Sequence, residues 1–262
     1  MKKLVAMIAL ALPLAACAVS QQEEVAMGGQ YSAQINQQLP IMTDPEVNRY
    51  INVLGDSLAR LTSRADLDWR FYIVNSREVN AFAVPGGYVY INRGLIDRMD
   101  NISQLAGVLG HEIGHVVRRH SVKQMQKAQG ANIGVTLACV LTRICDSQAA
   151  QAGIQVAGGA VFARFSRSDE NEADSEGVAN VVKARINPIG IPQMFRKLIE
   201  ERRARPAGVE AWFATHPLEE DRVAATEAMI AKYPQSQIGS YPRDTPNFQS
   251  FKRRVASFPA QQ

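Results

Sequence analysis

The stretch GVLGHEIGHVVRRH, residues 107–120, carries three of the four histidines of the chain within ten residues. An α-helix turns by about 100° per residue, so His111 and His115 lie only about 40° apart and both imidazoles can reach one metal ion. His120 falls on the opposite side, where we expect a cation near the helix C-terminus beside two arginines. Two histidines do not complete a metal site, so a further ligand must come from another segment.

An acidic segment, SRSDENEADSEG at residues 166–177, supplies that candidate. Glu170 and Asp174 are four residues apart and share one face of a helix. We predict that Glu170 binds the metal and that Asp174, one turn later, orients a ligand histidine. A solvated acidic face at the helix N-terminus accounts for the remaining carboxylates, Asp169, Glu172 and Glu176.

The length of 262 residues, with 46% hydrophobic and 21% charged residues, allows one domain with a real core. The formal charge is +4, but Lys2 and Lys3 lie in a segment that we expect to be removed. That leaves 27 basic and 25 acidic residues, a net charge of +2. This balance provides no electrostatic case for nucleic acid as a partner.

The N-terminus, MKKLVAMIALALPLAAC, has two lysines, a short apolar stretch and small residues that end at a cysteine. The apolar stretch is shorter than the roughly 20 residues of a spanning helix, which indicates an export signal over residues 1–16. LAAC resembles a bacterial lipoprotein signal, with Cys17 as the lipidated residue; an ordinary cleaved signal is the alternative. Because Ala18 is not the aspartate that retains many lipoproteins in the inner membrane, we expect the outer membrane, with the domain facing the periplasm.

Residues 17–43 are polar and rich in glutamine, which predicts a flexible tether between the lipid and the domain. The two other cysteines, Cys139 and Cys145, either form a disulfide or remain two buried thiols, and the sequence does not decide between these. Neither is expected to be catalytic, because nothing nearby would activate a thiolate.

The hydrophobic patterns predict an α+β fold, mainly α, with a domain over residues 44–232. A capped amphipathic helix begins after Asp44, and its apolar stripe, Val47, Ile51, Leu54, Leu58 and Leu61, is expected to face the core. The segment DWRFYIVNSREVNAFAVPGGYVYINRGLI, rich in aromatic and β-branched residues, predicts a small three-stranded sheet. The histidine helix is expected to start after Asp100 or Asn101 and to run to about Arg119. Packed helices are predicted over 128–165, then helices over 169–185, over 192–205 and after Pro217, followed by a tail over 233–262.

Four motifs in order, NAFAVPGGYVYINRGLI, LGHEIGHVVRRH, ENEAD and THPLEEDR, resemble the M48 gluzincin family of zinc metallopeptidases over about residues 44–232. The resemblance implies a zincin-type domain with one Zn²⁺ per chain, bound by His111, His115 and Glu170. It also implies that His216 and Arg222 line the site. The chain shows no transmembrane helices and no tetratricopeptide array of the kinds found in some members, so a small lipoprotein protease is expected.

The HExxH pattern places Glu112 where it can take a proton from the attacking water and pass it to the leaving amine. Charge that develops on the carbonyl oxygen could be stabilised by His216 or Arg222. The NAFA strand, Asn80, Ala81, Phe82 and Ala83, is expected to offer an open edge to an extended substrate backbone, although core packing is favoured for the Phe82 ring.

These features predict a zinc endopeptidase of the bacterial envelope that hydrolyses misfolded or stalled envelope and outer-membrane proteins. Its expected partners are unfolded polypeptides, the membrane through the lipid and, as a possibility, the outer-membrane assembly machinery. The alternatives are a chaperone-like assembly factor with a structural metal, and a non-catalytic scaffold that leaves the histidine spacing unexplained.

His216, the one histidine outside residues 107–120, has three possible roles. It could be a buried or capping residue before Pro217, an oxyanion donor, or a fourth zinc ligand that keeps the resting enzyme latent. We predict that His216 is a ligand at rest and a donor when displaced.

Overall fold

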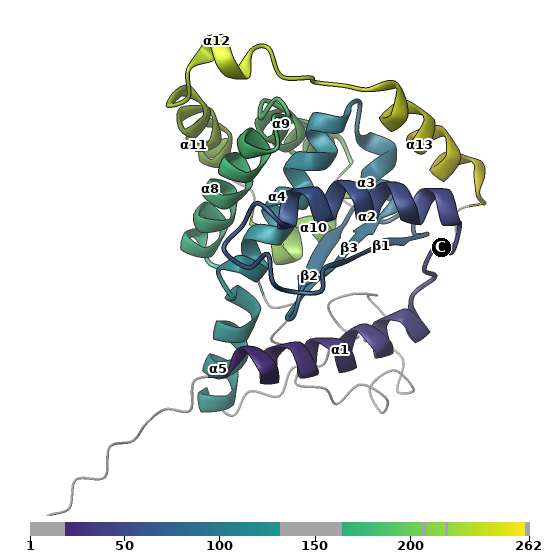
Figure 1. Cartoon of the computed structure of the whole chain (residues 1–262), viewed down its shortest axis with the longest axis vertical. Coiled ribbons are helices and arrows are strands. Elements are labelled where there is room, and N and C mark those ends of the chain that lie inside the picture. The colour runs from purple at the N-terminus through teal and green to yellow at the C-terminus, as the bar shows by residue number, and fades with distance from the viewer. Residues whose placement is uncertain (1–18, 132–163, 206–207, 218–219, 260–262) are drawn as a thin grey trace, which may run out of the picture.

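The computed structural model describes residues 19–131, 164–205, 208–217 and 220–259 (Figure 1). Its strands are β1 Arg70–Val74, β2 Ala81–Val84 and β3 Tyr88–Asn92. The N-terminal half holds five helices in the described residues: α1 Gln21–Gln38, α2 Pro45–Ala59, α3 Arg93–Arg98, α4 Ile102–Val117 and α5 His120–Ala131. The later helices are α8 Arg167–Lys183, α9 Gly190–Ala204, α10 Glu210–Thr215, α11 Glu220–Ala231, α12 Gln235–Ile238 and α13 Pro246–Ser257.

The sheet has the order β1-β3-β2, with β1 parallel and β2 antiparallel to β3. The turn between β2 and β3 needs glycine, because Gly86 and Gly87 have φ angles of 84° and 100°. The helices and the three strands together confirm the predicted mainly α fold with a small three-stranded sheet. Within the described sheet, β2 is an edge strand, as the sequence predicts.

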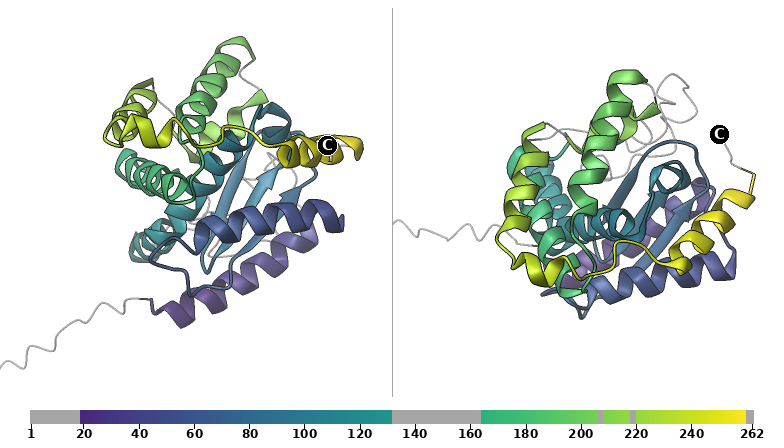
Figure 2. Two further views of the ribbon diagram at one scale, coloured as in Figure 1. Left: turned by 45° about the horizontal axis from the view of Figure 1, so that its top comes forward. Right: turned by 90° about the horizontal axis from the view of Figure 1, so that it is seen from above.

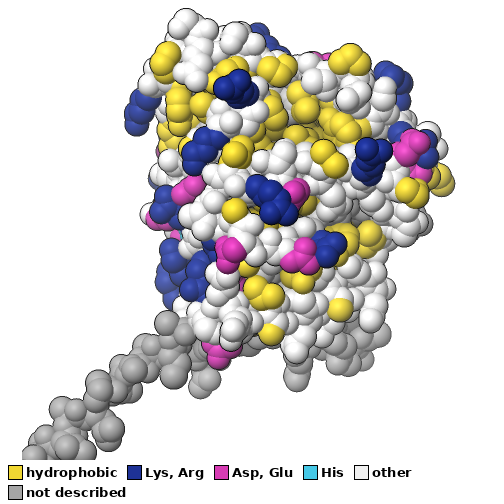
Figure 3. Space-filling view, viewed as in Figure 1, with side chains coloured by type: hydrophobic (Ala, Val, Ile, Leu, Met, Phe, Trp, Pro, Cys, Tyr) yellow, Lys and Arg dark blue, Asp and Glu magenta, His cyan; other side chains and the backbone are white. Residues whose placement is uncertain are grey.

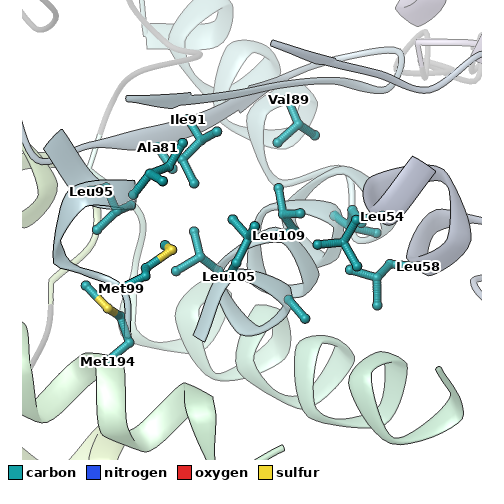
Figure 4. Packing of buried hydrophobic residues seen from close by; sticks show 14 of the residues in the cluster. Leu54, Leu58, Ala81, Val89, Ile91, Leu95, Met99, Leu105, Leu109 and Met194 are labelled. Atoms are coloured by element: carbon teal, nitrogen blue, oxygen red, sulfur yellow. The ribbon is translucent and has the colours of Figure 1, made fainter. Parts of the chain in front are cut away.

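The two faces of the sheet belong to two hydrophobic clusters, because side chains alternate along each strand. Val89 and Ile91 of β3 point toward Leu105 and Leu109 of α4 on one face, together with α2 (Figure 4). Tyr90 points to the other face, where α1 and α5 contribute to the second cluster. The sheet is therefore a middle layer between α2 and α4 on one side and α1 on the other (Figure 2).

Helix α2 begins as predicted: the Asp44 side chain accepts a hydrogen bond from the Val47 amide at 3.0 Å, and Pro45 is the first helical residue. Its predicted stripe is buried as far as Leu58, but Leu61 lies beyond the helix end and is 37% exposed. Leu61 is thus wrongly placed in the core by the sequence pattern.

Helices α4 and α8 approach closely because small residues face each other. A Cβ added to Gly114 would lie 2.8 Å from the carbonyl oxygen of Ala173, and one added to Gly110 would lie 3.2 Å from Gly177. The contact leaves no space for larger side chains and brings the acidic residues of α8 within reach of the histidines of α4.

Among the helices of the described residues, none combines the length and the apolar composition that spanning a bilayer requires.

The segment predicted as a polar tether contains helix α1, which packs on the sheet. Ser20 and Glu23 form a capping box at its start, and Tyr31 and Ile35 are buried in the second cluster. Helix α1 approaches Pro85 closely at Gly28, which has no side chain. A Cβ at this position would lie 1.8 Å from the Pro85 carbonyl oxygen. The tether prediction is wrong over α1. The many glutamines of this segment are typical of a linker, although apolar residues recur in it at helical spacing.

The predicted tail also contains folded helices. Helix α13 buries Phe248, Phe251 and Val255 against the main cluster. Cys17, Cys139 and Cys145 and most of the helical region predicted over 128–165 lie outside the described residues.

Candidate metal centre

Helix α4 carries the first part of the site. Its N-cap is Asn101, which accepts a hydrogen bond from the Gln104 amide at 3.1 Å. His111, Glu112 and His115 are all buried near the other end of α4. Histidines are not seen on the face drawn in Figure 3. The burial lowers the pKa of His115 well below its ordinary value, which favours the neutral imidazole that binds metals.

Four buried side chains from three segments converge on one point: His111, His115, Glu170 and His216 each offer a ligand atom within 4.8 Å of the others. His111 Nε2 lies 3.1 Å from His115 Nε2, 3.3 Å from His216 Nδ1 and 3.5 Å from Glu170 Oε2. Glu170 Oε1 lies 3.4 Å from His115 Nε2 and 3.2 Å from His216 Nδ1.

These distances match a metal site. Four tetrahedral ligands with metal bonds of about 2.0–2.1 Å are separated from one another by about 3.3 Å. Five separations among these four groups, counted with both Glu170 oxygens, range from 3.1 to 3.5 Å, and one ligand atom from each group lies within 4.8 Å of the others. The donor set of imidazole nitrogens and one carboxylate is therefore close to the spacing that a metal ion requires.

Asp174 and Arg222 support this group from behind. Asp174 Oδ1 lies 2.9 Å from His111 Nδ1, the arrangement expected for a residue that orients a ligand histidine. Arg222 donates from Nε and Nη2 to the two Asp174 oxygens at 2.9 and 2.7 Å, and from Nη1 to Glu170. Burial opposes the charge of Glu170, but His216 and Arg222 outweigh it and hold the Glu170 pKa well below its ordinary value.

Arg222 also donates to the Pro217 carbonyl oxygen at 3.1 Å and lies over the Phe195 ring at 4.6 Å. Four of the N–H groups of its guanidinium are thus committed to the protein. The sequence suggests Arg222 as a donor to the substrate oxygen, but this geometry favours a role in orienting Glu170 and Asp174.

Glu112 lies beside the ligand group without belonging to it. Its side chain is buried, and neither carboxylate oxygen has a hydrogen-bond partner in the described structure. Burial raises the pKa of Glu112, and nearby His216 and His111 oppose that rise. His216 Nε2 is 3.6 Å from Glu112 Oε1 and also lacks a partner, so both groups remain free to act on a bound molecule.

His216 ends helix α10, where its backbone amide donates to the Trp212 carbonyl oxygen at 2.9 Å. Its ring stacks on the Trp212 ring at 4.8 Å. Burial opposes protonation of His216, but Glu170 and Glu112 raise its pKa overall. The structure places His216 with the other candidate ligands, as the fourth-ligand hypothesis requires.

His120 is where the sequence prediction is wrong. Helix α4 ends at Val117, Arg119 adopts a φ of 58°, and His120 begins α5. The change of direction turns His120 inward: it is buried, and its Nδ1 lies 2.9 Å from His115 Nδ1. A continuous helix would have placed it on the far side, and no glycine in the sequence signals the left-handed residue.

Phe165 contacts the site, although the sequence patterns do not single it out. Its ring stacks on the His115 ring at 3.9 Å between centroids, and its amide donates to the Thr215 carbonyl oxygen at 3.0 Å. Phe165 thereby links the start of α8 to the segment that carries His216. Asp169 forms a capping box with Ser166 at the start of α8.

Residues 80–83 lie at the sheet edge with buried side chains. The Phe82 ring stacks on Tyr90 at 4.8 Å, which confirms core packing for that side chain. Asn80 Oδ1 is buried without a hydrogen-bond partner in the described structure. Any contact of this strand with a peptide must therefore involve its backbone.

Comparison with known proteins places this geometry in a family. Residues 45–230 match Peptidase family M48. The beta-barrel assembly-enhancing protease of Yersinia pestis is 33% identical over 217 residues, which cover 80% of this chain and 44% of that protein. The protein of the same name from Escherichia coli K12 is 31% identical over 210 residues, with coverages of 77% and 42%.

Metalloprotease YcaL from Escherichia coli K12 is 30% identical over 179 residues, 68% of each chain. The chain spans less than half the length of the two beta-barrel assembly-enhancing proteases. The match over residues 45–230 includes every candidate ligand, and it shows that the chain belongs to peptidase family M48 and is a metalloendopeptidase.

Proposed function

We propose that the chain is a zinc-dependent endopeptidase of the bacterial cell envelope that cleaves misfolded or stalled envelope and outer-membrane proteins. The observation that carries the peptidase mechanism is Glu112, a buried carboxylate whose oxygens have no hydrogen-bond partner among the described residues and which lies beside four convergent ligand atoms. A buried donor set of three imidazoles and one carboxylate suits zinc. One zinc ion per chain, held by His111, His115 and Glu170, is expected.

In this mechanism, zinc supplies Lewis acidity to the substrate carbonyl and to the attacking water. Glu112 accepts the proton of that water on one of its free oxygens and then gives it to the leaving amine. The buried surroundings raise the pKa of Glu112, which makes it a stronger base than an exposed glutamate. Asp174 keeps the proton of His111 on Nδ1, so that His111 Nε2 faces the ligand group.

His216 is proposed to change partners during turnover. At rest its Nδ1 belongs to the ligand group, which then closes the site with four protein ligands. A substrate that displaces His216 would bring the imidazole beside the reacting carbonyl, where it can donate to the developing oxyanion. The resting enzyme would thus be latent.

The four-ligand arrangement also favours a second candidate, an assembly factor whose metal is structural, because structural zinc sites are closed by protein ligands. Glu112 distinguishes the two. A structural site has no use for a buried carboxylate that the described part of the chain leaves without a hydrogen bond, because an unpaired buried charge is costly. In the peptidase, the Glu112 carboxylate acts as the general base.

The proposed location rests on the LAAC segment. The proposed substrates rest on the name of the relatives, beta-barrel assembly-enhancing protease. Lipidation at Cys17 would anchor the chain to the outer membrane on its periplasmic side. Fractionation of cells that express the parent chain or Cys17→Ser tests this: the parent should be found in the outer membrane and the variant in the soluble periplasm. A soluble parent chain would contradict the anchor.

The peptidase proposal is tested with purified parent chain, Glu112→Gln and the control Glu176→Gln, whose carboxylate pairs with Arg118 at the surface. Zinc content and casein cleavage are measured for each. The parent and the control should hold about one zinc per chain and cleave casein, whereas Glu112→Gln should hold zinc and not cleave. Zinc binding without cleavage by the parent, even at high casein concentration, would favour the structural-metal candidate. Capture of envelope proteins on Glu112→Gln in cells would identify the substrates.

A further inference from the structure

His115 and His120 form a contact that the peptidase mechanism does not use. Their Nδ1 atoms are 2.9 Å apart, and both rings are buried. On the other side of His120, its Nε2 lies 3.7 Å from Asp169 Oδ1 and 3.6 Å from Glu172 Oε2. His120 therefore lies between a candidate metal ligand and two carboxylates of α8.

We propose that His120 is a positioning residue that fixes the tautomer and the ring orientation of the ligand His115. The proposal rests on the metal site described under the proposed function. It assigns to the second histidine of the HExxH pattern the kind of support that Asp174 gives to the first.

The proton positions follow from counting donors. Two neutral Nδ1 atoms at 2.9 Å can form a hydrogen bond only if one carries the proton and the other a lone pair. His115 directs Nε2 toward His111 and Glu170, so a metal there requires the Nε2 lone pair and leaves the proton on Nδ1. His120 must then accept on Nδ1 and carry its own proton on Nε2, which faces the carboxylates of Asp169 and Glu172.

The backbone around His120 is held in an unusual conformation. Arg119, at φ 58°, lies in the left-handed region, which costs a non-glycine residue free energy and persists only when the surroundings enforce it. Its side chain donates to Glu24 Oε2 at 2.7 Å and to the Val19 carbonyl oxygen at 2.5 Å. Both acceptors belong to α1 or the residue just before its cap.

The buried carboxylate of Glu24 is also linked, through Arg64, to the C-terminal end of α4. Glu24 Oε1 accepts from Arg64 at 2.6 Å, and Arg64 donates to the Val116 carbonyl oxygen, next to His115, at 3.0 Å. Phe165 stacks on the His115 ring at 3.9 Å. His115 is therefore confined by a ring contact and by a hydrogen-bond partner whose position the α1 contacts maintain.

The competing interpretation is that His120 merely fills space in the core. Two substitutions separate the interpretations. In His120→Asn, the side-chain Oδ1 can occupy the position of Nδ1 and accept the same hydrogen bond. His120→Leu has a similar size but no acceptor. The control is Lys123→Ala, an exposed residue one turn along α5.

Zinc affinity of the full chain is measured by competition with a chelator at fixed pH, a readout independent of peptidase activity. Loss of a residue that orients a ligand weakens metal binding by roughly 10–100-fold, which is the expectation for His120→Leu. His120→Asn and Lys123→Ala should remain within about threefold of the parent, well below the effect of losing such a residue. Unchanged affinity in the leucine variant, or equal losses in the leucine and asparagine variants, would overturn the proposal while leaving the peptidase proposal intact.

A second measurement needs no substitution at His120. Nitrogen-15 NMR of the zinc-loaded chain, carrying Glu112→Gln to prevent self-cleavage, reports which ring nitrogen of each histidine is protonated. We expect the proton on Nδ1 of His115 and on Nε2 of His120. A His120 protonated on Nδ1 overturns the proposal alone, whereas a parent chain that binds no zinc overturns both this proposal and the proposed function.

Discussion

Replacement of Arg222 by methionine tests how much the fold depends on the ion cluster behind the metal site. Methionine keeps the apolar stem over Phe195 but removes four hydrogen bonds, three of them to the carboxylates of Asp174 and Glu170. Both carboxylates are fully buried and would lose their arginine. Removing one partner of a buried ion pair costs about 3–5 kcal/mol, against a total of about 5–15 kcal/mol for a domain.

The assay is urea unfolding at pH 7 in a chelator, so that no metal compensates for the lost charge. The free energy of unfolding of Arg222→Met should fall by about 3–5 kcal/mol, and the loss should shrink when zinc is present because zinc neutralises Glu170. The control Arg203→Met breaks the exposed pair with Glu220 and should cost at most about 1 kcal/mol. A loss below about 1 kcal/mol in metal-free Arg222→Met would refute the view that the cluster stabilises the fold.

Four further substitutions probe other parts of the structure. Asp44→Asn should be less stable than the parent above about pH 4, because Arg254 and the Val47 amide hold the pKa of Asp44 at about 2; this difference in melting temperature should vanish as the pH falls through 2. Phe248→Ala should lower the free energy of unfolding by about 3–5 kcal/mol, and no loss in urea unfolding would show that α13 is dispensable. Glu170→Ala should lose zinc in a chelator competition, and retention of zinc would assign the third ligand elsewhere. His216→Ala should bind zinc more weakly and also turn over casein more slowly, by roughly 10²–10³ in kcat; if both are unchanged, His216 is only a packing residue.

The parts of the site that the sequence predicts are those governed by local geometry. His111 and His115, and likewise Glu170 and Asp174, share helix faces because a helix repeats every 3.6 residues, whatever surrounds it. Their placement together requires α4 and α8 to touch, and the glycines that permit the contact are visible in the sequence but have no unique meaning there. The resemblance in motifs predicts this long-range link.

The parts that the sequence does not predict depend on tertiary contacts. Arg119 turns His120 inward, and its left-handed conformation is enforced by Glu24, which lies 95 residues earlier. Helix α1 did leave a local signal, since Ser20 and Glu23 match a capping box, but the polar composition outweighed it. The resemblance in motifs identifies Arg222 as a site residue, whereas its role in orienting Asp174 and Glu170 follows from its contacts with those carboxylates.

The folded state of α1 changes what a lipid at Cys17 would do, if the proposed anchor is present. A flexible tether over residues 17–43 could extend to roughly 90 Å, at about 3.3–3.6 Å per residue, and would let the domain sample a wide zone. With Gln21–Gln38 helical and docked through Glu24, only the step from Cys17 to Gln21 separates the lipid from the domain, roughly 14 Å at full extension. The metal centre would then stay near the membrane surface. Because the same helix supports Arg119 beside His120, the segment that sets this distance is also one that holds a ligand histidine in place.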